Sequence, residues 1–286
     1  NFALDFGPYL LMGVFVSYAI VGSYFFAYQI TAQIGVLLSY NLQLVLFPAL
    51  TRLNKEPERH RAAMLRALRA LMLVGSISSL GLAAVIIPME DLIWRGRWAP
   101  EALVVIVFGV FFPWRITYGL CAAMLMARGR FQAYAWMTAI EGVGLIVFST
   151  VASAITPDPV LIALASGIWL LIARVGSTLW LVREVGATVS ESLRSLLPAW
   201  LFAMLAGALG LAADLFIDLR PLVAPLADPL HPEVGRTILN VARILLSGSV
   251  CALTFLTLTR LRLPDQLRET VTAFPGPIRT LGFRIL

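Results

Sequence analysis

The chain alternates long apolar runs with short clusters of charged and turn-forming residues. Residues 6–51 carry no Asp, Glu, Lys or Arg, whereas residues 52–69 hold six Arg or Lys. A helix that crosses a bilayer needs about 20 mainly apolar residues. The uncharged stretch is therefore long enough for two spans, and we expect the break near Ser17–Ser23, where small polar residues and a glycine gather.

Prolines and polar turns separate the later apolar runs. Examples are Pro88, "WAPE" at 98–101, "ARGR" at 127–130 and "TPDP" at 156–159. The pattern predicts an all-α fold, a polytopic membrane bundle over residues 1–259 with a tail at 260–286. The eight transmembrane helices that we expect cover about 1–17, 20–51, 63–87, 102–126, 132–155, 160–182, 197–217 and 237–259.

Two further segments are open to two interpretations. Residues 183–197 and 264–274 are either short amphipathic helices on the membrane surface or plain polar connections.

Composition supports a lipid environment. Of the 286 residues, 59% are hydrophobic and only 13% are charged, about half the roughly 25% usual for soluble domains. The net charge of +6 comes from basic residues between the apolar runs, so we expect membrane lipid and no nucleic acid as a partner. Cys121 and Cys251 lie inside apolar runs, where a disulfide is not expected.

The basic residues alternate from one connection to the next. Cytoplasmic loops of membrane proteins retain Arg and Lys. If loop 52–62 is cytoplasmic, then 127–131, 183–196 and the tail are too, and this side, counted out to the flanking helical turns, holds fifteen basic and six acidic residues. The opposite side holds four basic and seven acidic residues. The pattern predicts a multi-pass protein of the plasma membrane with a cytoplasmic C-terminus.

Four stretches resemble a known family in order and spacing. They are "VGSYFFAYQI" at 21–30, "LFPALTRLNKEPERHRAAMLRALR" at 46–69, "GLAAVIIPMEDLIWRGRWAPEALVV" at 81–105 and "LMARGRFQAY" at 125–134. Together they resemble the bacterial polysaccharide transport, or O-antigen (Wzx-type), flippases. That family belongs to the superfamily that includes the MATE drug exporters.

The resemblance implies both a fold and a function. Members have twelve to fourteen helices in two lobes, so eight helices here would form the MATE-like C-terminal lobe, with an N-terminal lobe of six missing from the chain. The implied activity is alternating-access movement of an undecaprenyl-diphosphate-linked oligosaccharide from the cytoplasmic to the periplasmic leaflet of the bacterial inner membrane. Surface polysaccharides such as O-antigen are built from this substrate, and polysaccharide polymerases and other assembly proteins are the implied partners.

Two arginines within the expected spans are candidates for the substrate cavity. A charged side chain in the bilayer costs roughly 2.5–3.5 kcal/mol, so it needs a partner or water. Arg115 follows Pro113 by two residues, and its forked donors suit a diphosphate or an acidic sugar. The alternatives are an ion pair with Glu141 or snorkelling for Arg115, and snorkelling to the cytoplasmic surface for Arg174.

Uncharged polar residues of the second span form a possible cavity wall. Gln29, Gln33, Tyr40 and Gln43 have helical spacing, and Tyr28 lies beside them. Such a stripe suits sugar hydroxyls and ring faces, although hydrogen bonding between helices explains it equally well.

Two carboxylates are candidates for proton or sodium coupling. Glu141 and Asp5 fall within expected spans, where ion-coupled transporters keep such groups. The alternative for each is an ion-paired group, or for Asp5 a residue at a helix end.

Signals of an enzyme are weak. The two histidines, His60 and His231, fall on opposite sides of the membrane, and the sequence has no phosphate-binding P-loop. We therefore expect no catalytic residues, no metal and no cofactor. Three other functions remain open: a MATE-like exporter of cationic drugs, a membrane enzyme of polysaccharide assembly, and a non-transporting scaffold.

Overall fold

A computed structural model describes residues 2–227 and 232–273. The side chains of a few residues within helices lie outside this description. Within these ranges every regular element is a helix. The elements are α1 (Phe2–Phe15), α2 (Tyr18–Gly35), the π-helical η1 (Val36–Tyr40), α3 (Asn41–Arg52), the 3-10 helix η2 (Leu53–Lys55), α4 (Pro57–Trp94), α5 (Glu101–Ile116), α6 (Tyr118–Ala127), α7 (Phe131–Ile155), α8 (Pro159–Glu184), α9 (Val189–Phe216), α10 (Arg220–Ala227), α11 (Pro232–Arg262) and α12 (Pro264–Ala273).

Seven segments of the described chain, where we expected eight, are long and apolar enough to cross a membrane. The expected first span, 1–17, is the short helix α1, which has 14 residues. It ends because Ser17 adopts an extended backbone at the start of α2. The other expected spans have counterparts among the seven, which run Tyr18–Ser39, Pro57–Trp94, Glu101–Ala127, Phe131–Ile155, Pro159–Glu184, Val189–Phe216 and Glu233–Arg262.

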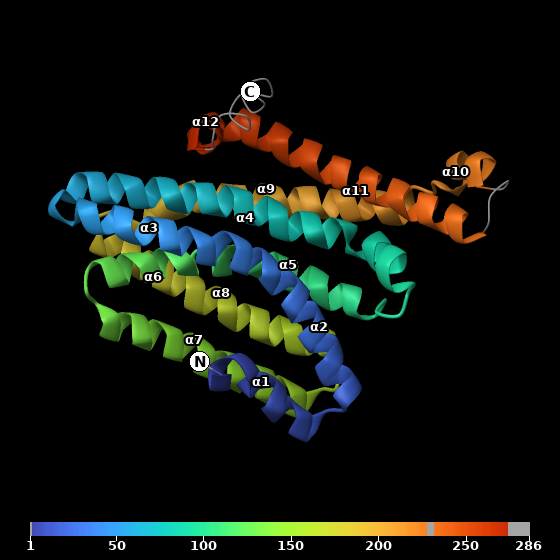
Figure 1. The fold of residues 1–286 in the computed structure, drawn as a ribbon, viewed down its shortest axis with the longest axis horizontal. Coiled ribbons are helices and arrows are strands. Elements are labelled where there is room, and N and C mark those ends of the chain that lie inside the picture. Colours follow the sequence, from blue (N-terminus) through green and yellow to red (C-terminus); the bar gives the residue numbers. More distant parts are fainter. Residues whose placement is uncertain (1, 228–231, 274–286) are drawn as a thin grey trace.

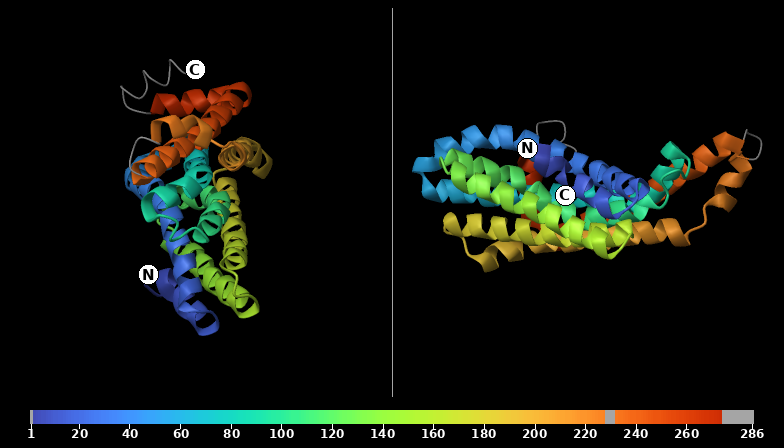
Figure 2. Two further views of the ribbon diagram at one scale, coloured as in Figure 1. Left: turned by 90° about the vertical axis from the view of Figure 1, so that its right-hand side faces the viewer. Right: turned by 90° about the horizontal axis from the view of Figure 1, so that it is seen from below.

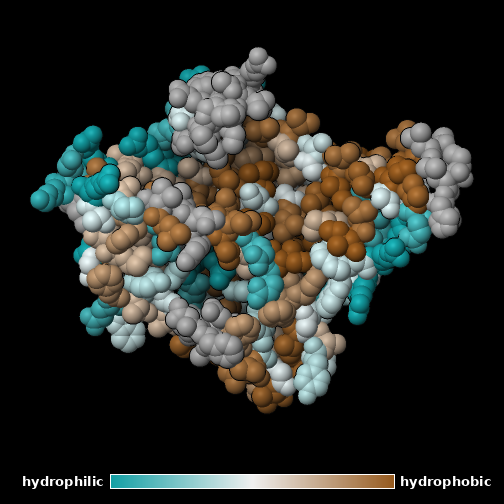
Figure 3. Space-filling view, in the orientation of Figure 1, coloured by the Kyte–Doolittle hydropathy of each residue, from teal (hydrophilic) through white to brown (hydrophobic). Residues whose placement is uncertain are grey.

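Polar residues gather towards the two ends of the long axis, and much of the surface between them is apolar (Figure 3). One end, which we call the basic end, joins the segments where basic residues are in excess. Arg61 of α4 pairs with Glu191 of α9 at 2.9 Å. Arg130, in the connection between α6 and α7, pairs with Glu184 at the end of α8. The connections that the charge pattern assigned to one side of a membrane therefore do meet at one end.

The sequence left two segments open to two interpretations. In the structure α9 begins within the first, 183–197, and α12 covers most of the second. Residues 183–197 form no separate surface helix, because α9 runs unbroken from Val189. Residues 264–273 do form a helix, but its Leu267 is buried against α4, α9 and α11. Glu269 of α12 pairs with Arg69 of α4 at 3.1 Å. The apolar face of α12 thus packs on the bundle.

One half of the bundle, α4, α9 and α11, is joined through small residues. Ala199, Ala203 and Ala206 of α9 are fully buried there. A side chain on Gly210 would meet the Ser247 carbonyl oxygen at 2.7 Å. Small residues let helix backbones approach closely, which is how helices gain packing energy in lipid. This half is therefore close-packed.

The other half contains α1, α7 and α8, with α2, α5 and α6 between the two halves (Figure 1). Helix α8 packs against both α5 and α7, whereas α5 and α7 have little direct packing with each other. Two further views show the elongated bundle, with α10 and the adjoining end of α11 extending beyond it (Figure 2). Large aromatic residues such as Tyr24, Phe108 and Phe112 fill the core between α2 and α5.

Candidate functional site

A bend between α5 and α6 places Arg115 in the interior. Pro113 lacks a backbone N–H, so the helix loses one of its hydrogen bonds at this point. At the bend, the hydroxyl of Thr117 lies 2.7 Å from the carbonyl of Trp114 and 3.0 Å from the hydroxyl of Thr178 on α8. The second contact ties the bend to the neighbouring helix.

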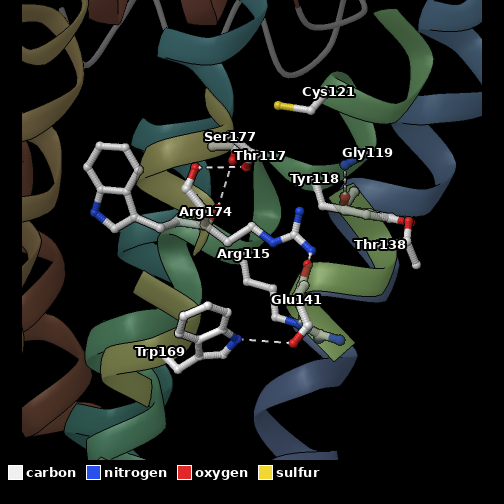
Figure 4. A network of polar contacts seen from close by, with 12 residues as sticks. Arg115, Thr117, Tyr118, Gly119, Cys121, Thr138, Glu141, Trp169, Arg174 and Ser177 are labelled. Carbon is white, nitrogen blue, oxygen red and sulfur yellow. Dashed lines mark hydrogen bonds and ion pairs between the residues drawn. The ribbon is translucent and has the colours of Figure 1, made fainter. Parts of the chain in front are cut away.

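Two arginines converge on one carboxylate (Figure 4). Arg174 of α8 forms an ion pair with Oε2 of Glu141 on α7. Arg115 Nε lies 3.7 Å from Oε1 of the same carboxylate. The Arg174 side chain is only 3% exposed, whereas that of Arg115 is 28% exposed. Glu141 therefore joins three helices, and the group carries one net positive charge.

Neighbouring groups hold this triad in place. The indole N–H of Trp169 donates to the Glu141 backbone carbonyl at 3.1 Å, which fixes α7 against α8. The Arg174 guanidinium lies over the Tyr118 ring at 4.4 Å from its centroid. The Arg115 guanidinium lies 5.4 Å from the centroid of Tyr28. Aromatic faces attract cations, and more strongly where water is excluded.

Three hydroxyl groups cluster beside the triad. The Tyr118 hydroxyl lies 3.0 Å from that of Tyr134 and 3.1 Å from that of Thr138. Tyr134, Thr138 and Glu141 are three or four residues apart and so share one face of α7. This face presents donors and acceptors of the kind that sugar hydroxyls pair with.

These groups line a cavity of about 600 Å³. Its charged lining residues, within the part of the chain described, are the two arginines and Glu141. Its lining residues are Phe6, Tyr28, Gln29, Ala32, Gly35, Val36, Ser39, Gln43, Arg115, Tyr118, Tyr134, Thr138, Glu141, Gly142, Leu145 and Arg174. The cavity thus combines a cationic group with hydroxyls, amides and aromatic rings.

The π-helical segment η1 forms part of the cavity wall and is attached to α6. The Gly119 N–H donates to the Ser39 hydroxyl at 2.7 Å. A side chain on Gly119 would collide with the Ser39 backbone, so glycine is required for this approach. π-Helical segments occur often at functional sites, and this one also changes the direction in which the following residues face.

The structure brings most of the candidates from the sequence together. Arg115, Arg174, Glu141, Tyr28 and Gln29 all line the one cavity.

Of the remaining candidates, Gln33 is the one whose side chain the structure describes, and it does not join them. Gln33 is exposed and does not line the cavity, so the predicted stripe is not a continuous wall. The side chains of Asp5 and Tyr40 lie outside the described residues. The alternative interpretation of Arg115, an ion pair with Glu141, is present in the structure, with Arg174 as the closer partner.

Several lining residues went unnoticed in the sequence. Tyr118 follows Arg115 by three residues, and Tyr134 and Thr138 precede Glu141 by seven and three. Helical spacing from the two charged residues would have found all three. Ser39 of the lining and Trp169, which bonds to the Glu141 carbonyl, have no comparable signal, because their roles depend on contacts between helices.

Comparison with known proteins gives a family match over part of the chain. Residues 1–103 match a family model described as "polysaccharide biosynthesis protein". No curated protein and no solved structure matches the chain. The match covers α1 to α4 and so includes Tyr28, Gln29 and Ser39 of the cavity, but neither arginine. Over this part the chain is similar to that family, which supports a role in polysaccharide biosynthesis.

Proposed function

We propose that this chain is the C-terminal lobe of a flippase for undecaprenyl-diphosphate-linked oligosaccharides in the bacterial inner membrane. The substrate moves from the cytoplasmic to the periplasmic leaflet for surface polysaccharide synthesis, by alternating access against an N-terminal lobe. The basic end faces the cytoplasm, as the positive-inside rule requires. The observation that carries the proposal is the net positive, hydroxyl-rich cavity within an apolar bundle.

The two arginines have different roles. Arg174 is buried, is paired with Glu141 and lies over Tyr118, so its charge is already neutralised. Arg115 is more exposed, and its contact with Glu141 is long. Arg115 is therefore the group that meets the diphosphate, and Arg174 positions Glu141. Bidentate hydrogen bonds between a guanidinium and a phosphate are among the strongest polar contacts in proteins.

The cavity chemistry argues against a cationic drug as substrate. An exporter of cations needs carboxylates that are not paired with arginine, because the carboxylate must attract the cation. Glu141 is paired with both Arg115 and Arg174. Tyr134 and Thr138 add hydroxyls that suit a glycan. We propose transport, with no catalytic step, and polysaccharide polymerases act on the substrate afterwards.

Export by the complete gene tests the proposal. A bacterium that lacks its own flippase and makes a matched precursor receives the gene that contains this chain, and surface polysaccharide is measured. We expect wild type to restore it. We expect Arg115→Gln to lower export at least about tenfold, because a charge-assisted contact to the diphosphate is lost.

The matched control is Arg66→Gln, which removes one positive charge from an exposed position at the basic end. We expect Arg66→Gln to leave export unchanged if the loss of export in Arg115→Gln is caused by a change in the cavity. Membrane levels of each variant are measured on the same cells. Full export by Arg115→Gln at normal protein level removes Arg115 from the site, and failure of wild type with several matched precursors contradicts the flippase function.

A further inference from the structure

We propose that Glu141 is an internal counter-ion that competes with the substrate for Arg115, so that substrate binding releases a contact between α5 and α7. The inference rests on the proposed function, because it assigns a control element to the same cavity. It differs from a role of Glu141 in carrying a coupling ion. The contact in question is the 3.7 Å pair between Arg115 Nε and Glu141 Oε1.

The arrangement of helices makes this pair a link across the cavity. Helix α8 packs against α5 on one side and α7 on the other, while α5 and α7 pack little against each other. Arg115 and Glu141 both line the cavity. The ion pair therefore connects the α5 and α7 walls through the space that a ligand would occupy (Figure 4).

The two ion pairs of Glu141 differ in how easily they break. The pair with Arg174 is buried, and the Trp169 indole bound to the Glu141 carbonyl also holds α7 on α8. Removing one partner of such a pair leaves a buried charge. The pair with Arg115 is long and partly exposed, so its rupture leaves Arg115 hydrated and Glu141 still paired. Arg115 is the partner that can leave.

An anion that enters the cavity can replace Glu141 at Arg115. The anion then neutralises the net positive charge of the triad, and α5 loses its direct ion pair with α7 while both helices stay packed on α8. By linkage, the factor by which the intact Arg115–Glu141 pair weakens anion binding equals the factor by which a bound anion weakens the pair. Removing a carboxylate from the binding cavity is thus expected to increase affinity for an anion.

Anion binding by the purified protein in nanodiscs tests this directly. Inorganic pyrophosphate is the probe, and its affinity is measured by isothermal titration calorimetry. We expect Glu141→Gln to bind pyrophosphate about threefold more tightly than wild type, because the pair that it removes is long and partly exposed and therefore weak. We expect Glu141→Gln/Arg115→Gln to lose the gain. Equal or weaker binding by Glu141→Gln overturns the proposal.

A second variant guards against misfolding and against binding at Arg174. Glu141→Gln leaves Arg174 without its buried partner, so Glu141→Gln/Arg174→Gln is prepared as a neutral pair. We expect it to bind pyrophosphate more tightly than wild type too. If the gain persists in Glu141→Gln/Arg115→Gln, the anion binds Arg174 and the assignment of Arg115 is wrong.

Spin labels on α5 and α7 report the release itself. Leu103 and Ile155 are exposed, and both lie at the end opposite to the basic end. Pyrophosphate is expected to lengthen or broaden the distance distribution between labels at these sites in wild type. Glu141→Gln is expected to show this distribution without the anion. An unchanged distribution in both overturns the release.

The outcomes separate this inference from the flippase function. Pyrophosphate binding requires neither a glycan nor transport. If export fails but Glu141→Gln gains affinity, the counter-ion role stands and the cavity serves another anion. If export succeeds and the affinity does not change, the flippase function stands and the counter-ion role falls.

Discussion

The helices in the two halves of this bundle are held together by different kinds of contact. Around α4, α9 and α11, small residues bring the backbones together, and Gly210 leaves no room for even a methyl group beside Ser247. In the half with α7 and α8, where it meets α5, long side chains surround a cavity, and Arg174 and Glu141 form an ion pair. The first half gains mainly from van der Waals contact, with one ion pair between Arg243 of α11 and the buried Asp214 of α9, whereas the second has its ion pairs at a cavity.

The comparison teaches where change can occur. A close-packed interface is sensitive to added volume and has few alternative arrangements. A cavity with charged groups has alternatives, because water or a ligand can replace an internal partner. We therefore expect the α4–α9–α11 half to act as a scaffold, and the half with Arg115 and Glu141 to move.

The largest expected effect comes from Arg174→Ala. It leaves the buried Glu141 carboxylate without its nearest partner, so the free energy of unfolding should fall by about 3–5 kcal/mol. Arg115→Ala is the matched control and should cost less than about 1 kcal/mol, because Arg115 is partly exposed and its pair is long. Denaturant titration in mixed micelles measures both. Equal losses would show that the two arginines share the charge equally.

Next comes Gly210→Val in the close-packed half. The new side chain would lie 2.7 Å from the Ser247 carbonyl oxygen and 3.0 Å from the Cβ atom of Cys251, so the helices must separate. Overpacking of this kind costs about 1–3 kcal/mol. Gly176→Val on α8, where nothing lies within 4 Å, is the control. If thermal melting shows the two variants to be equally stable, the close packing has no energetic role.

A smaller effect is expected from Ser39→Ala. The variant leaves the buried Gly119 N–H without its acceptor, at a cost of about 1 kcal/mol. Ser195→Ala is the control, because its hydroxyl donates to the carbonyl of Ser192, three residues earlier in the same helix. Thermal melting compares the two. A larger loss in the control would show that η1 is not anchored by this bond.

The smallest effect is expected from Arg59→Ala at the basic end. Its side chain is 74% exposed, and its pair with Glu56 is local. Surface ion pairs contribute little because water screens them. Thermal melting should show no measurable change. A clear fall in melting temperature would show that surface ion pairs stabilise this protein as the cavity ion pairs do.

Helical spacing predicted much of the site but not its contacts. Arg115 and Glu141 stood out because charge is rare in apolar runs, and both line the cavity. Gln29 and Gln43 of the predicted stripe line the cavity and Gln33 does not, because the packing of neighbouring helices decides which positions face the cavity. The span count was less secure, since α1 is only 14 residues long.

By itself, the sequence determined that this is a helical membrane bundle with basic residues at one end. Hydrophobic length and charge placement suffice for that, because they are set by the bilayer rather than by contacts between helices. The tertiary structure alone decided that Arg174, and not Arg115, is the closer partner of Glu141. That choice depends on how α5, α7 and α8 pack against one another, and the local pattern of residues along the sequence does not predict contacts between separate helices.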